Sequence, residues 1–235
     1  MTYLKNTLSL LLALLCLSSN AQNTKFSIRL ETNVGFSDRI FVADEDVKGV
    51  IDVVAELEKT KPAIDFGLLA GYSLSKKVEI AVGVRYTDWG YQTEKRALVP
   101  VFPDPVIPDF IAYKSQNRYV EIPIRINYDL HRGKNIFYIW GGYFPSYNIS
   151  NHIITTSYFP DETITMRVED LPTAYEYRRF NMIAELGIGI SKAISPKIGL
   201  TVGPNIRSQT IGIIKDAPLN RLLLFYGLSV GIHLK

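Results

Sequence analysis

Nine charged residues stand at alternate positions inside otherwise apolar segments, where they could form ion pairs or line a path for ions. Four are cations and five are anions: Arg29, Glu31, Asp65, Glu79, Arg85, Glu121, Arg125, Glu185 and Arg207. Buried charges must be paired to offset their large desolvation cost, so this set predicts a structural network of ion pairs. The alternative is a gated path, in which the network rearranges to open a narrow pore.

The sequence offers little for catalysis or metal binding. His152 follows Ser150 and precedes Asp161 and Glu162, which are residue types of a hydrolase, but nothing in the spacing brings them together. No His/Cys cluster occurs, and the acidic run 44–46 lacks the glycine and spaced ligands of a calcium loop. We therefore expect no catalytic residue, cofactor or metal, and keep an outer-leaflet hydrolase as an alternative.

The N-terminus has the layout of a secretory signal peptide. Lys5 precedes a short apolar run, and the small residues Ser19 and Ala21 mark a cleavage site. The run is too short for a transmembrane helix. We expect residues 1–21 to be removed and residues 22–235 to form the exported domain. The only cysteine, Cys16, would be lost with the signal peptide.

Composition excludes several classes of protein. Of the 235 residues, 47% are hydrophobic and 21% are charged, which is too apolar for a disordered chain. The formal net charge of +3 gives no signature of nucleic-acid binding.

Alternation of apolar and small or polar residues recurs through the exported domain and predicts strands. The predicted strands cover 24–36, 62–74, 78–86, 118–130, 135–148, 178–191, 197–208 and 220–235. Segment 135–148 is apolar on both faces, so its sides cannot be assigned from the pattern.

The connections alternate between short turns and long polar or proline-rich loops, near 37–61, 94–117, 149–177 and 208–219. This layout is typical of an all-β, eight-stranded antiparallel up-and-down transmembrane barrel with long extracellular loops. It predicts a monomeric barrel in the outer membrane of a Gram-negative cell. Outer-membrane lipid would surround it.

A soluble lipocalin-like ligand carrier is the alternative fold, with its apolar face inward. The non-apolar face here is mostly Gly, Ala and Ser, which suits the tight lumen of a small barrel better than a water-facing exterior. Aromatic residues on the apolar face form two expected girdles. One holds Phe26, Tyr72 and Tyr128, and the other holds Phe36, Tyr86, Phe180 and Tyr226.

The stretch Tyr119-Val120-Glu121-Ile122-Pro123-Ile124-Arg125 resembles a Tyr-(Leu/Val)-Glu-Ile-Pro-(Leu/Ile) motif of the PorT-like outer-membrane β-barrel family of Bacteroidetes. The resemblance implies the architecture of small OmpA- and OmpX-type barrels and a link to protein secretion. It assigns no activity. Pro123 within a central strand predicts a bulge that redirects the strand.

The long loops are the predicted contact surface for a partner. Loop 94–117 carries the apolar residues Val101, Phe102, Val106, Ile107 and Phe110 among prolines. They would form either a lid over the barrel mouth or a docking surface for an envelope or secretion-machinery protein. Residues 47–59 predict an amphipathic helix, and 149–177 predict a protruding hairpin. We therefore expect a non-enzymatic structural or partner-binding protein, with a narrow porin-like channel as the alternative.

Overall fold

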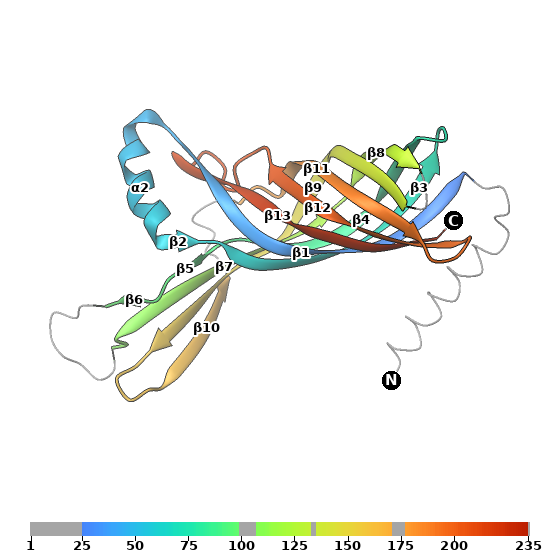
Figure 1. The fold of residues 1–235 in the computed structure, drawn as a ribbon. Helices are drawn as coiled ribbons and strands as arrows, with labels where there is room; N and C mark the ends of the chain where they lie inside the picture. The colour runs from blue at the N-terminus through green and yellow to red at the C-terminus, as the bar shows by residue number, and fades with distance from the viewer. Residues whose placement is uncertain (1–24, 99–106, 133–134, 171–176, 235) are drawn as a thin grey trace.

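The computed structural model describes residues 25–98, 107–132, 135–170 and 177–234 (Figure 1). Residues 1–21, the predicted signal peptide, lie outside the described residues. The predicted eight-stranded antiparallel barrel is confirmed. Its ring is made of β1 (Phe26–Ala43), β3 (Lys61–Ser73), β4 (Val78–Trp89), β7 (Phe110–Glu121) continued by β8 (Ile124–Arg132), β9 (Asn135–Tyr158), β11 (Phe180–Ala193), β12 (Ile198–Gln209) and β13 (Leu219–Leu234).

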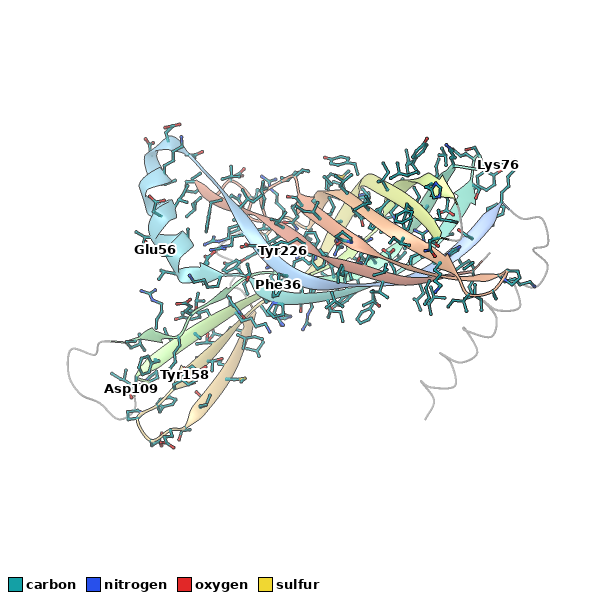
Figure 2. The ribbon with its side chains drawn as sticks, viewed as in Figure 1. Phe36, Glu56, Lys76, Asp109, Tyr158 and Tyr226 are labelled. Carbon is teal, nitrogen blue, oxygen red and sulfur yellow. The ribbon has the colours of Figure 1, made fainter. Side chains whose placement is uncertain are left out.

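The ring closes where β1 pairs with β13, from Ile28 opposite Leu234 to Ala43 opposite Leu219. The other side of β1 pairs with β3. Closure leaves no unpaired edge inside a membrane, where unpaired backbone groups would be costly. We call the end with the short turns, near Lys76, the turn end, and the end with the long connections the outer end (Figure 2).

Pro123 separates β7 from β8 without ending the transmembrane strand. Proline has no N–H to donate to the ladder. Its carbonyl still accepts from Gly83 N (3.1 Å), and Ile122 N donates to the Pro145 carbonyl (3.0 Å). The predicted bulge at Pro123 is wrong, because the register with β4 and with β9 is the same on both sides of residues 122–123 and no extra residue is inserted. The ladder is only interrupted for two residues.

The apolar face of the strands points outward and the polar face inward. Leu30, Val34 and Phe66 are about half exposed, whereas Glu31, Asn33 and Asp65 are buried. Aromatic rings pair on the exterior at both ends, Phe26 with Tyr72 near the turn end and Phe36 with Tyr226 near the outer end. This arrangement is that of a transmembrane barrel and contradicts the lipocalin-like alternative.

Strand β9 resolves the segment whose sides the sequence left open. Tyr138, Trp140 and Phe144 are buried in the lumen, while Ile139 and Tyr143 are exposed on the exterior. The segment is apolar on both faces because the lumen, too, holds aromatic rings at this strand.

The outer end carries further elements between the barrel strands. They are η2 (Glu45–Val47), α2 (Lys48–Leu57), β2 (Glu58–Lys59), β5 (Gln92–Thr93), β6 (Arg96–Ala97) and β10 (Ile164–Asp170). The predicted helix and hairpin are confirmed as α2 and as the antiparallel pair β9–β10. None of the helices in the described ranges is long and apolar enough to cross a membrane.

A sheet projects from the outer end at an angle to the barrel axis (Figure 1). We call it the outer sheet. It consists of β6, residues 110–118 of β7, residues 150–158 of β9, and β10, paired in that order. The predicted boundaries were wrong here, since residues 110–117 belong to a strand rather than to a loop. Hydrogen bonding to β9 keeps residues 110–117 extended beyond the rim. Their composition alone did not indicate a strand.

Candidate functional site

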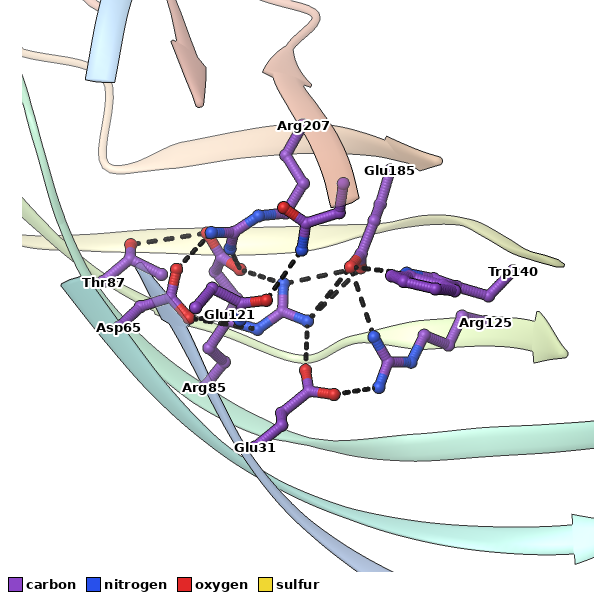
Figure 3. A network of polar contacts seen from close by, with 11 residues as sticks. Glu31, Asp65, Arg85, Thr87, Glu121, Arg125, Trp140, Glu185 and Arg207 are labelled. Atoms are coloured by element: carbon purple, nitrogen blue, oxygen red, sulfur yellow. Dashed lines mark hydrogen bonds and ion pairs between the residues drawn. The ribbon is translucent and has the colours of Figure 1, made fainter. Parts of the chain in front are cut away.

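Arg85 is the centre of the lumenal charges (Figure 3). Its guanidinium lies 2.7 Å from Glu31 Oε1, 3.2 Å from Glu121 Oε2 and 3.3 Å from Glu185 Oε1. Asp65 Oδ1 lies 4.0 Å from its Nε. The side chain is fully buried, so four carboxylates from four strands neutralise one cation away from water.

Two further arginines complete the network. Arg125 pairs with Glu31 and with Glu185, the latter at 3.2 Å. Arg207 pairs with Asp65 and with Glu121. Three guanidinium groups thus face four carboxylates, a formal excess of one negative charge. Each arginine contacts at least two carboxylates, so removing one would leave several buried charges uncompensated.

Arg29 and Glu79, the other two predicted residues, form a separate pair nearer the turn end, at 3.1 Å. Ser27 Oγ and Asn127 Nδ2 also donate to the Glu79 carboxylate, at 2.9 and 2.8 Å. Arg29, Glu79 and Asn127 line a cavity of about 80 Å³. The structure therefore places all nine predicted residues in the lumen, but divides them into a group of seven and a pair.

Trp140 is part of the network, although the sequence did not single it out. Its Nε1 donates to Glu185 Oε1 at 3.1 Å, and the Arg125 guanidinium lies 5.9 Å from the ring centroid. The indole lies over Gly187 on β11, where a β-carbon would come within 2.2 Å of the ring. Alternating glycines on the lumen face of β11 were the available signal for a large side chain on the neighbouring strand.

An apolar cluster fills the lumen between the network and the outer end. Its members are Ala63, Trp89, Tyr119, Phe144, Ile183, Ile213, Leu223 and Phe225. Trp89 stacks on Phe225 with ring centroids 6.4 Å apart, and the Arg207 guanidinium lies 4.3 Å from the Phe225 ring centroid. The alternation pattern did not predict this cluster, because it indicates polar and small residues inside the barrel. The interior is filled, first by charges and then by aromatic rings, which is how small barrels close their lumen.

At the rim, Glu58 joins helix α2 to the barrel. Its carboxylate accepts from Arg39 Nε at 3.1 Å and from the Arg221 guanidinium at 2.6 Å. Arg221 also lies 5.1 Å from the Tyr91 ring centroid. Burial raises the pKa of the Tyr91 phenol, against the lowering effect of the Arg221 charge. Burial likewise raises the pKa of Tyr177.

The structure describes two of the five predicted partner-contact residues, Ile107 and Phe110, and both side chains are 37% exposed. Val101, Phe102 and Val106 lie outside the described residues. Phe110 stands opposite Tyr158 in the outer sheet, and Lys95 Nζ lies 4.2 Å from both ring centroids. Phe110 projects with the outer sheet beyond the rim.

His152 does not meet the acids considered with it. It lies in β9 opposite Gln116, whereas Asp161 and Glu162 lie in the hairpin turn beyond Tyr158. Tyr158 lies six residues along β9 from His152, a span of about 20 Å. Among the described residues, no group of three or more His, Cys, Asp or Glu side chains is placed to hold a metal ion.

No protein-family model matches this sequence, and no curated protein matches it. Several solved structures are similar in fold. Neisserial surface protein A is 13% identical, with a TM-score of 0.46, covering 90% of this chain and 97% of that one. The outer membrane protease OmpT of Escherichia coli is 8% identical, with a TM-score of 0.45, covering 91% and 99%. OprG of Pseudomonas aeruginosa is 11% identical, with a TM-score of 0.38, covering 88% and 94%. At these values the likeness concerns the β-barrel fold alone.

Proposed function

We propose that this protein is a non-enzymatic barrel of the outer membrane whose filled barrel anchors the outer sheet, and that the outer sheet binds a partner protein of the cell envelope. The filled lumen supports an anchor rather than a porin-like channel. The motif at 119–125 supports membership of the PorT-like family, and with it a partner in protein secretion. An N-terminal signal peptide would deliver the chain to the outer membrane.

The observation that carries the proposal is the open edge of β10. In the described part of the chain, β10 pairs only with β9. Phe159 N donates to the Thr163 carbonyl at 3.0 Å. Because donors alternate along an antiparallel ladder, the N–H groups of Ile164, Met166 and Val168 point away from β9. An exposed row of this kind is a template for an added strand.

A proline on this edge tests the proposal. Val168→Pro removes one outward N–H and leaves the β9–β10 ladder intact. Val168→Ala is the control, because it also removes the valine side chain but keeps the N–H. A photo-crosslinking residue at Arg167, whose side chain is exposed, would report the partner in intact cells. We expect one protein adduct, lost in Val168→Pro and retained in Val168→Ala. Equal adducts in both variants, or no adduct at all, would contradict binding at the edge.

A further inference from the structure

One face of the outer sheet continues the exterior of the barrel, and the other face continues the lumen side. Along β7, Tyr119 and Asn117 point into the lumen, so the alternate positions Lys114, Ala112 and Phe110 continue the exterior. Cross-strand register places Tyr158 and Ile164 beside Phe110, and then further residues of β9 and β10 beside Ala112 and Lys114. We call this side of the sheet the outer face.

The outer face is apolar and exposed along β10. On β10, Ile164, Met166 and Val168 are 57%, 74% and 63% exposed. The opposite face of the same strand carries Thr165 and the ion pair of Arg167 with Glu169, at 2.7 Å. The apolar face and the polar face of β10 are arranged like those of an amphipathic helix that lies at a membrane surface.

Two lysines lie on the outer face. Lys95 covers the rings of Phe110 and Tyr158, and Lys114 lies on β7. No ion pair joins either lysine to a carboxylate within the described ranges. Arg118 lies nearer the rim, 3.9 Å from Asp88. Aromatic and basic side chains together suit the boundary where acyl chains meet anionic headgroups.

We propose that the outer face of the outer sheet lies against the outer leaflet, with its apolar side chains in the lipid and Lys95 and Lys114 on the phosphate groups of anionic lipids. The face is continuous with the lipid-facing wall of the barrel, and Figure 1 shows the sheet bending away from the barrel axis. This contact goes beyond the partner role, because it uses the face of the sheet and not its edge.

Site-directed fluorescence in vesicles tests the contact without any partner protein. In a Cys16→Ser background, single cysteines replace Met166 on the outer face, Arg167 on the opposite face, or Leu200 on the lipid-facing wall. Each carries the same fluorophore, and the protein is placed in vesicles of phosphatidylcholine and phosphatidylglycerol that contain doxyl-labelled lipid. Heat-dependent gel migration confirms that each labelled barrel is folded.

We expect the lipid to quench the label at Met166 about as strongly as that at Leu200, and about twofold more than that at Arg167. Equal, weak quenching at Met166 and Arg167, with strong quenching at Leu200, would overturn the proposal. In vesicles with phosphatidylglycerol, the pair Lys95→Gln and Lys114→Gln should reduce quenching at Met166. An unchanged signal would overturn the role of the two lysines. The vesicles contain no protein that could bind the edge of β10. A negative quenching result would therefore contradict the lipid contact and would not bear on edge binding.

Discussion

Trp140 occupies the space that a side chain at Gly187 would need, because a β-carbon at Gly187 would lie 2.2 Å from the indole ring. The two residues stand opposite each other on β9 and β11. The glycine therefore allows the indole to lie across the lumen and donate to Glu185.

Gly187→Ala should displace the indole and break its hydrogen bond to Glu185. We expect a loss of about 1–3 kcal/mol in the free energy of unfolding, as for overpacked cores. Gly141→Ala is the matched control on the neighbouring strand, where a β-carbon would meet only ordinary contacts at 3.5 Å or more. Urea titration followed by gel migration would measure both variants. Equal stability of the two would contradict the packing argument.

Arg85→Met should destabilise the barrel strongly, because it leaves four buried carboxylates around an uncharged side chain. Breaking buried ion pairs costs about 3–5 kcal/mol. Arg29→Met is the control, since Arg29 has one ion-pair partner and lies near the turn end. The midpoint of urea unfolding should fall much further for Arg85→Met. A similar shift in both would show that Arg85 is not the centre of the network.

The filled lumen should not conduct ions. Purified protein in a planar bilayer is expected to give no discrete conductance steps. The double variant Glu121→Ala and Arg125→Ala should also stay closed while losing stability, because the cluster around Trp89 and Phe225 still fills the lumen. Steps in the unaltered protein, changed in this variant, would instead support the gated path.

The rim should respond to alkaline pH through its buried tyrosines. Burial raises the pKa of Tyr91 and of Tyr177 above the ordinary value of 10.0, so each neutral phenol is favoured by folding. Their contribution to stability is complete below pH 10.0 and is lost as the pH rises through the folded-state pKa.

Absorbance at alkaline pH would follow this ionisation. Tyr91→Phe should remove a late-titrating phenol from the curve, whereas Tyr113→Phe, at an exposed position, serves as the control. Loss of the same late phase in both variants would contradict the assignment to Tyr91.

The sequence by itself determined the strands and their two faces. Alternation is local, since successive side chains of a strand point to opposite sides, and so residues such as Glu31 and Leu30 were assigned inside and outside without any tertiary contact. The small residues of the non-apolar face, mostly Gly, Ala and Ser, separated a transmembrane barrel from a lipocalin-like one. Alternation could not assign the sides of 135–148, where both faces are apolar.

Only the tertiary structure decided which lumenal charges meet. Arg207 and Asp65 are 142 residues apart, and Arg85 and Glu185 are 100 apart. Their pairing depends on the stagger of strands around the closed ring, which no local pattern contains. The same holds for the outer sheet, because residues 110–117 become a strand through their ladder with β9. A strand beyond the rim exists only where a partner strand satisfies its backbone hydrogen bonds.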